Sequence, residues 1–114
     1  MRHEAGQVMT RRLNTGPLFV PLKREYFEAF ARGEKTVEWR REGPKWNRGT
    51  CRVGRRVTLS LGYQGRRRLF GTVTSVTLQA ANDPPQAEFF GAGTLCILIA
   101  IALDPPADTT PSCP

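Results

Sequence analysis

Hydrophobic and polar residues alternate most regularly over residues 56–63, a pattern that favours a half-buried β-strand. In an extended chain every second side chain lies on the same face, and that face carries Val57, Leu59, Leu61 and Tyr63. Residues 64–68 follow with a glycine and three consecutive arginines, and residues 69–78 are again rich in apolar side chains. Two such segments around a glycine-containing turn predict an antiparallel hairpin.

The most apolar stretch of the chain, residues 95–103, predicts a different kind of strand. All of its side chains are apolar, isoleucine is frequent, and it lies between Gly93 and Pro105. A continuous apolar run of this length is typical of a strand that is buried on both faces. A membrane-spanning helix is excluded for this run, because such a helix needs about 20 apolar residues.

A strand and a helix are predicted near the N-terminus. Residues 17–23 form an apolar segment, and Pro21 keeps the strand short or places it at an edge of the sheet. Residues 24–32 follow with helical spacing. We expect this helix to point one apolar stripe into the core, formed by Tyr26, Phe27 and Phe30.

The remaining segments complete a mostly β (α+β) domain. Residues 42–54 read as a loop, and residues 79–93 as a long connection with one helical turn. The chain therefore has about five to six strands and one main helix, which together favour a small, mostly antiparallel β-barrel with the helix at its mouth. We expect one domain over residues 17–103, a flexible segment over residues 1–16 and a Pro-rich flexible tail over residues 104–114.

The charge is unevenly distributed and indicates an anionic partner. The chain carries +7 overall, with twelve Lys or Arg and only three Glu between Arg32 and Arg68. Residues 69–114 contain no Lys or Arg and four acidic residues. A concentrated basic region is typical of a nucleic-acid-binding face, and a solvated basic surface without a partner remains the alternative.

The cysteines and the single histidine argue against metal chemistry. Cys51, Cys96 and Cys113 are widely spaced, and His3 is in the expected N-terminal segment. Neither residue type has the spacing of a zinc site, so we expect no metal and no cofactor. Cys96 reads as a small core residue, whereas Cys51 lies in the basic loop, where a reactive thiol is one possibility. Reduced thiols and the absence of an apolar leader favour a cytoplasmic protein.

The densest candidate chemistry is in residues 33–40, Gly-Glu-Lys-Thr-Val-Glu-Trp-Arg. Gly33 fits the left-handed position that ends many helices, and residues 35–41 predict the next strand. Glu38 and Arg40 share one face of that strand, and Lys35 reaches the same cleft if the backbone turns at Gly33. Two cations can hold a phosphate, and the glutamate can orient the lysine, accept from a base or move a proton. A purely structural ion pair that braces the barrel mouth is the alternative.

The loop after this strand combines an aromatic side chain with cations. Trp46 lies among Lys45, Arg48 and Arg52. Cations bind the backbone of a single-stranded nucleic acid and a flat ring stacks on its bases. The alternative is that Trp46 folds back and covers one end of the core.

The segment from Gly33 to Arg40 resembles the G-x-K-x-x-E-x-R signature of the ASCH family, at all four of its fixed positions. The resemblance extends in layout over roughly residues 17–103 and implies a PUA-like β-barrel that binds RNA in a cleft between the barrel and its helix. Some members are small hydrolases, either amidohydrolases of N4-acetylcytidine or ribonucleases. In the amidohydrolase group the motif resembles G-x-K-T-x-T; Lys35 matches its lysine, but Glu38 replaces the second threonine, and Glu88 is a candidate for the later acid.

These observations lead to three hypotheses. The first is an ASCH-type RNA-binding domain that holds single-stranded RNA or a modified nucleotide between Lys35, Glu38 and Arg40. Trp46 or Tyr63 would stack on a base, and the backbone phosphates would meet Arg41, Lys45, Arg48, Arg52, Arg66, Arg67 and Arg68. The second is a small hydrolase on the same scaffold with Lys35 and Glu38 as catalytic residues. The third is a non-catalytic module whose basic face binds an acidic protein. We expect no membrane partner in any of the three.

Overall fold

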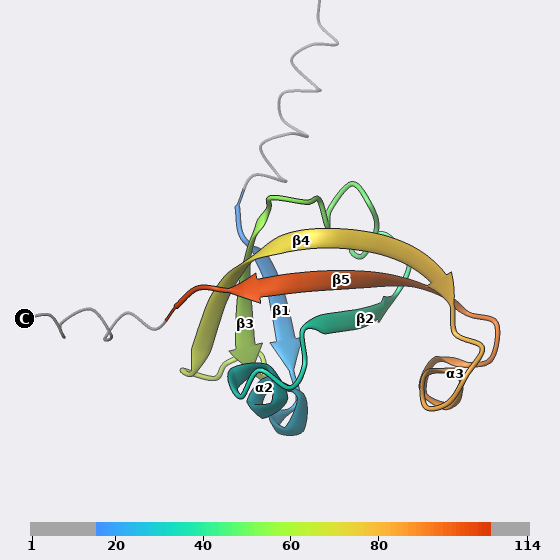
Figure 1. The fold of residues 1–114 in the computed structure, drawn as a ribbon, viewed down its shortest axis with the longest axis horizontal. Coiled ribbons are helices and arrows are strands. Elements are labelled where there is room, and N and C mark those ends of the chain that lie inside the picture. The colour runs from blue at the N-terminus through green and yellow to red at the C-terminus, as the bar shows by residue number, and fades with distance from the viewer. Residues whose placement is uncertain (1–15, 106–114) are drawn as a thin grey trace, which may run out of the picture.

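The computed structural model describes residues 16–105. Its elements, in chain order, are β1 (Leu18–Leu22), α2 (Arg24–Ala31), β2 (Val37–Arg41), β3 (Arg56–Leu61), β4 (Arg68–Ala80), α3 (Gln86–Phe90) and β5 (Leu95–Leu103) (Figure 1). Every strand and helix expected from the sequence is present, including the helical turn in the long connection. The predictions for the two terminal segments, His3 and Cys113 lie outside the described residues, so the division into three segments stays a prediction.

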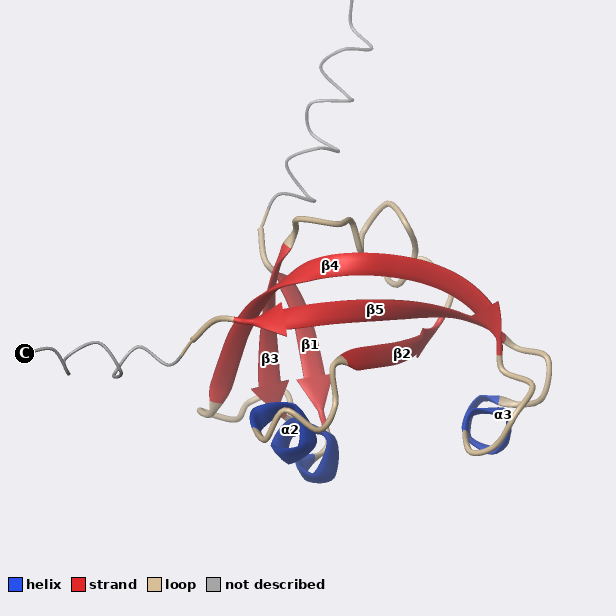
Figure 2. Ribbon diagram, viewed as in Figure 1, coloured by secondary structure: helices blue, strands red, loops and turns tan. Residues whose placement is uncertain are grey.

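The five strands form one curled sheet in the order β1-β3-β4-β5-β2. β1 and β3 are parallel, whereas the other three neighbouring pairs are antiparallel. The sheet curls into a half-barrel, and both helices lie on the same side of it (Figure 2). The predicted small, PUA-like, mostly β barrel with one main helix is therefore confirmed.

Alternating side chains from the strands build the core inside the curl. Val57 and Leu59 of β3 are buried, as are Ile97, Ile99 and Ile101 of β5. Helix α2 adds Phe27 and Phe30, which are almost completely buried. Each such side chain contributes about 1.5–3 kcal/mol by leaving water. Tyr26, which we expected in the core with them, is partly exposed instead, because it lies at the edge of the apolar stripe and turns toward a pocket.

β4 is long enough to pair with β3 through its first half and with β5 along most of its length. Its register with β5 shifts between Val73 and Ser75, which is the signature of a β-bulge. Near this bend, Gly71 passes close to β5: a Cβ atom at this position would lie 2.5 Å from the backbone oxygen of Ala102. A residue without a side chain is therefore required where the two strands meet.

β5 differs from the expectation that both of its faces are buried. Its inner residues are buried, but Leu98 and Ala100 are only half-buried. A half-barrel has one face that no second layer covers, so the outer side chains of β5 keep contact with solvent although the strand has a neighbour on each side. No helix within residues 16–105 is long and apolar enough to cross a membrane.

Candidate functional site

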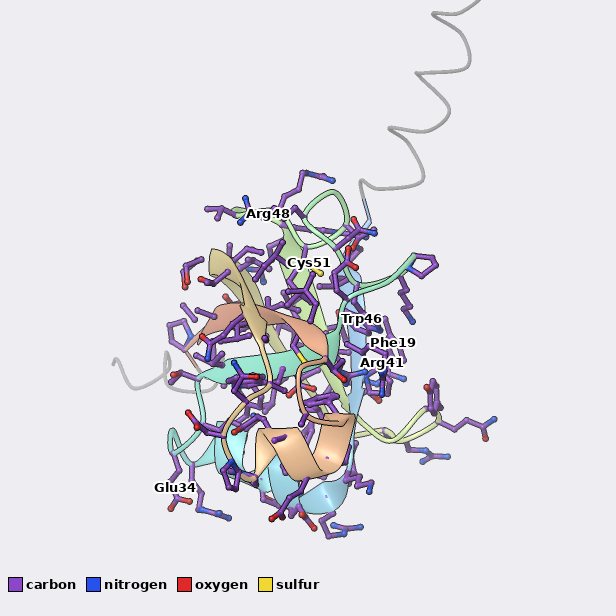
Figure 3. The ribbon with its side chains drawn as sticks, turned by 90° about the vertical axis from the view of Figure 1, so that its right-hand side faces the viewer. Phe19, Glu34, Arg41, Trp46, Arg48 and Cys51 are labelled. Atoms are coloured by element: carbon purple, nitrogen blue, oxygen red, sulfur yellow. The ribbon has the colours of Figure 1, made fainter. Side chains whose placement is uncertain are left out.

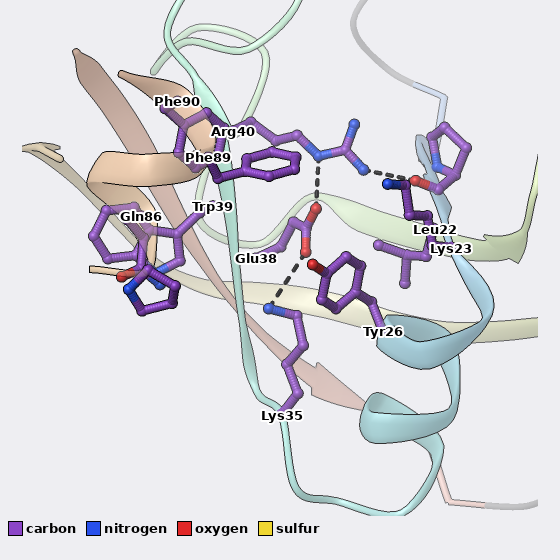
Figure 4. A pocket seen from close by; sticks show the side chains of 12 residues that line it. Leu22, Lys23, Tyr26, Lys35, Glu38, Trp39, Arg40, Gln86, Phe89 and Phe90 are labelled. Atoms are coloured by element: carbon purple, nitrogen blue, oxygen red, sulfur yellow. Dashed lines mark hydrogen bonds and ion pairs between the residues drawn. The ribbon is translucent and has the colours of Figure 1, made fainter. Parts of the chain in front are cut away.

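A pocket of about 390 Å³ opens between the C-terminal end of β1, the start of α2, strand β2 and helix α3 (Figure 4). Its volume is within the range of pockets that bind small molecules. Three cationic side chains and one carboxylate lie among mostly apolar and aromatic residues in its wall. The lining residues are Pro21, Leu22, Lys23, Tyr26, Lys35, Glu38, Trp39, Arg40, Pro85, Gln86, Phe89 and Phe90.

Glu38 is the centre of the polar part of this pocket. Only 7% of the residue is exposed. Arg40 donates from Nε to its Oε2 at 2.6 Å, and Lys35 Nζ lies 3.6 Å from its Oε1. Glu38 and Arg40 meet because they are two positions apart on β2 and share its inner face. The second carboxylate oxygen thus has an ion-pair partner at longer range and room to accept a hydrogen bond from a ligand.

Lys35 reaches Glu38 because the chain turns sharply after α2. Gly33 has a φ of +79°, and the backbone amides of Glu34 and Lys35 both donate to Ala29 at the end of the helix. Lys35 Nζ then donates to the carbonyl oxygen of Val37 at 2.7 Å. The turn at Gly33 that we assumed from the sequence is therefore present, and it brings the lysine into the pocket.

Arg40 connects the pocket to the rest of the barrel. Its Nη2 donates to the carbonyl oxygen of Pro21 at 2.7 Å, and its guanidinium lies 4.5 Å above the ring of Trp46. Two of its donors are therefore engaged by Glu38 and Pro21. These contacts agree with the bracing role that we considered as the alternative for this ion pair.

Aromatic side chains form the walls on either side of the ionic group. Tyr26 of α2 is 36% exposed, and its ring lies 5.6 Å from Lys35 Nζ. On the opposite wall Phe89 is 63% exposed and packs edge-on against Phe90. Figure 4 shows Glu38 between these two walls, with Arg40 and Lys35 on either side of it. Aromatic faces of this kind can stack on a flat ligand.

Helix α3 is held over the pocket by two hydrogen bonds to the carbonyl oxygen of Phe90. One donor is Arg41 Nη2 at 3.0 Å, and the other is Thr94 Oγ1 at 2.9 Å. From α3, sequence reasoning considered only Glu88, which is exposed and does not line the pocket. The sequence feature that could have indicated α3 is the pair Phe89-Phe90, two adjacent aromatic residues followed by a glycine in the long connection.

Trp39 is a second residue of the pocket that the sequence pattern did not assign to it. Alternation along β2 predicts that Val37 and Trp39 lie on the face opposite Glu38. Both are half-buried in the structure, and Trp39 still contributes to the lining. β2 is the last strand of the sheet order, so side chains from both of its faces reach the pocket around this edge.

The other predicted cations do not converge on the pocket. Lys45 lies over Trp46 at 5.3 Å, and Arg48 and Arg52 are exposed on the loop between β2 and β3. Figure 3 shows Arg48 at the opposite end of the molecule from Glu34, which follows α2. The exposed residues Arg66 and Arg67 lie in the turn between β3 and β4, and the exposed Arg68 begins β4. None of these cations is among the residues that line the pocket, so their role in binding stays a prediction.

Trp46 and Cys51 belong to the interior of the basic loop. Trp46 is half-buried and packs against the core cluster, so it covers one end of the core. Cys51 is completely buried, and a fully buried thiol is not available for the surface reactivity that we considered. Cys96 is buried as expected, and burial raises the pKa of its thiol, with a smaller opposing effect of Arg41. Within residues 16–105, no group of three His, Cys, Asp or Glu is arranged to hold a metal ion.

The curled five-stranded sheet with one main helix defines a small PUA-like β-barrel domain. Two crystal structures of ZmASCH mutant proteins from Zymomonas mobilis are similar to it. The first structure aligns with a TM-score of 0.62 and 14% sequence identity. The aligned region covers 78% of the present chain and 69% of the ZmASCH chain. The second aligns with a TM-score of 0.57 and 15% sequence identity, and the aligned region covers 73% of the present chain and 66% of the ZmASCH chain.

The likeness to these structures shows that the chain has an ASCH-like fold, as the motif implied. The chain spans about two thirds of the length of these two proteins. No protein-family model and no curated protein matches the chain.

Proposed function

We propose that the pocket binds a nucleotide, either an unpaired nucleotide of single-stranded RNA or a free, modified one. The observation that carries this proposal is the nearly buried carboxylate of Glu38, paired with Lys35 and Arg40 between aromatic walls. A base needs a flat apolar slot together with a few hydrogen-bonding groups at its edge. Glu38 accepts from an amino group of the base, and Lys35 donates to a carbonyl oxygen beside it.

The charge of the pocket supports an anionic ligand. Lys23, Lys35 and Arg40 outnumber the single carboxylate of Glu38 in the wall. Because Arg40 is engaged by Glu38 and Pro21, the exposed Lys23 at the rim is the better placed of the other cations to meet a phosphate. A ligand with a flat ring and one or more phosphates fits both parts of the pocket.

Calorimetric titration with the four nucleoside monophosphates tests this proposal. Glu38→Gln keeps the shape of the side chain but removes its charge, and we expect it to weaken binding by roughly tenfold or more. Glu34→Gln is the matched control, because Glu34 is exposed in the same segment and does not line the pocket. Equal affinities of the two variants would contradict the role of Glu38, provided that thermal unfolding shows both to be folded.

One observation also favours a hydrolase. Lys35 and Glu38 place an amine and a carboxylate 3.6 Å apart inside a pocket, and such pairs can transfer protons in catalysis. The test is incubation with N4-acetylcytidine or single-stranded RNA, followed by chromatography of the products. A hydrolase would release product, and Lys35→Ala would abolish the release while the fold survives. Binding without turnover would support the first proposal instead.

We also propose that the protein acts in the cytoplasm. The cysteines that the structure describes, Cys51 and Cys96, are both free thiols. Free thiols are typical of proteins from a reducing compartment, which supports this location. Fractionation of cells followed by detection of the protein tests it.

A further inference from the structure

The outer face of β1, β3 and β4 carries a second cluster of aromatic and cationic side chains, separate from the pocket. We call it the outer aromatic face and define it by Phe19, Tyr63, Arg68 and Phe70. Phe19 lies opposite Thr58, and Thr58 lies opposite Phe70. Side chains of directly opposed residues point to the same face of a sheet. The core residues of these strands occupy the alternate positions, so this cluster faces away from the core.

The exposure of these rings is not explained by the fold. Tyr63 is 74% exposed and Phe70 is 51% exposed. The rings of Phe19 and Tyr63 are 6.4 Å apart and tilted by 41°, and the guanidinium of Arg68 lies 5.4 Å from the ring of Phe19. A group of exposed aromatic side chains around a cation is characteristic of a binding surface.

The charges beside these rings select an anionic partner. Among residues 16–105 no carboxylate forms an ion pair with Arg66 or Arg68, and both are exposed. Arg67 differs, because it pairs with Glu28 at 2.6 Å and lies over the ring of Phe27. Arg68 donates from Nε to the carbonyl oxygen of Gly65 at 3.1 Å, and its terminal nitrogens and Arg66 are therefore available for phosphates. The aromatic rings beside them offer faces for bases. This combination is the one that single-stranded nucleic acids require.

The outer aromatic face continues from the pocket around one strand. Phe19 is two residues before Pro21 on β1, and Pro21 lines the pocket. β1 is the first strand of the sheet order and therefore has one unpaired edge. An RNA strand with one nucleotide in the pocket can pass over this free edge of β1. It then reaches Phe19 and Tyr63 on the outer face of the sheet.

We propose that the outer aromatic face binds the nucleotides that neighbour the one in the pocket. The ligand is then a strand of single-stranded RNA several nucleotides long, and not a free nucleoside. This inference rests on the proposed function for the nucleotide in the pocket. Tyr63, Phe19 and Phe70 stack on successive bases, and Arg66 and Arg68 bind the phosphates between them.

Fluorescence anisotropy with labelled oligocytidylates of one to eight nucleotides tests the inference, because cytosine carries the amino group that Glu38 would bind. We expect affinity to rise with length until the outer aromatic face is covered. Tyr63→Ala should weaken binding of the longer oligomers by about 5- to 150-fold and leave cytidine monophosphate binding unchanged. Tyr63→Phe should retain the wild-type affinity, because stacking needs the ring and not the hydroxyl. If affinity rises equally with oligomer length in the wild type and in Tyr63→Ala, the inference is overturned.

Two further variants separate a phosphate contact from a general loss of charge. Arg68→Ala should reduce the slope of log affinity against log salt by about 0.7, the value for one phosphate of a single strand. Arg32→Ala also removes one exposed cation, but Arg32 pairs with Glu34 outside this face, so its slope should match the wild type. Equal slopes for the two variants would overturn the inference.

The outcomes distinguish this inference from the proposed function. One outcome is that only Glu38→Gln loses monophosphate binding and that affinity does not rise with oligomer length. This outcome supports nucleotide binding in the pocket and rejects binding at the outer aromatic face. If Tyr63→Ala changes the sedimentation behaviour of the protein but not its affinity for the oligomers, the face binds a second copy of the chain. That result would also reject RNA as its partner.

Discussion

Arg40 of β2 joins the two ends of the sheet by donating from Nη2 to the carbonyl oxygen of Pro21 on β1 at 2.7 Å. β1 and β2 are the first and last strands of the sheet order. A side chain therefore bridges the seam of the half-barrel where no ladder of backbone hydrogen bonds is formed. The same guanidinium pairs with Glu38, so the seam and the polar centre of the pocket depend on one residue.

Arg40→Ala should destabilise the fold. It removes the bridge to Pro21 and leaves the buried carboxylate of Glu38 with only Lys35, at 3.6 Å. Breaking a buried ion pair by removing one partner costs about 3–5 kcal/mol, and we expect the lower part of this range because Arg40 is partly exposed. Urea unfolding measures the loss. Arg48→Ala is the control, since an exposed loop cation should change stability by less than about 0.5 kcal/mol. Similar losses for both variants would contradict the bridging role.

Gly71→Ala should also destabilise the fold, through a steric clash. The new Cβ atom would lie 2.5 Å from the backbone oxygen of Ala102, so β4 and β5 would have to separate. Overpacking of this kind costs typically 1–3 kcal/mol. Gly43→Ala is a matched control, because a Cβ atom there meets nothing within 4 Å. Thermal unfolding compares the two, and an unchanged melting temperature for Gly71→Ala would show that the strands are not so close.

The ion pair between Arg56 and Asp104 should make a small contribution to stability that depends on pH. The hydrogen bond from Arg56 lowers the pKa of Asp104 below its ordinary value. A carboxylate whose pKa is lower in the folded state stabilises the fold above its unfolded pKa, and this effect disappears as the pH falls through the folded pKa. Asp104→Asn should therefore be less stable than the wild type at neutral pH, with the difference in melting temperature vanishing in strong acid. A difference that is constant with pH would contradict this contribution.

Phe89→Ala should weaken nucleotide binding without a comparable loss of stability. Phe89 is largely exposed and forms one wall of the pocket. Loss of one stacking ring costs about 1–3 kcal/mol per base, which corresponds to roughly 5- to 150-fold in affinity. Phe70→Ala removes a similarly exposed ring outside the pocket, so it should leave the affinity for a nucleoside monophosphate unchanged. Equal effects of the two variants on monophosphate binding would argue against the aromatic wall.

Most of the fold could be predicted from the sequence because it is coded locally. Alternation identified β3, and the glycine-containing turn before an apolar segment identified β4. Helical spacing identified α2, and Gly33 marked the turn that brings Lys35 to Glu38. The resemblance of the Gly33–Arg40 segment to the ASCH signature implied the fold that the structural comparisons show. These features depend on residues that are close together in the chain.

The parts of the site that could not be predicted depend on contacts between distant segments. Phe89 and Phe90 reach the pocket only because α3 returns across the end of β2, more than 40 residues after it in the chain. Arg40 was considered as a ligand-binding cation, and its contacts with Pro21 and Trp46 depend on how the sheet curls. No periodicity in the sequence predicts the position of α3 at the pocket or the contacts of Arg40.

A crystal structure of the protein soaked with cytidine 5′-monophosphate tests the central claim most directly. We expect the base between Tyr26 and Phe89, with its amino group within hydrogen-bonding distance of Glu38 and its phosphate near Lys23. An empty pocket with the nucleotide bound instead on the loop of residues 42–54 would contradict the proposed site.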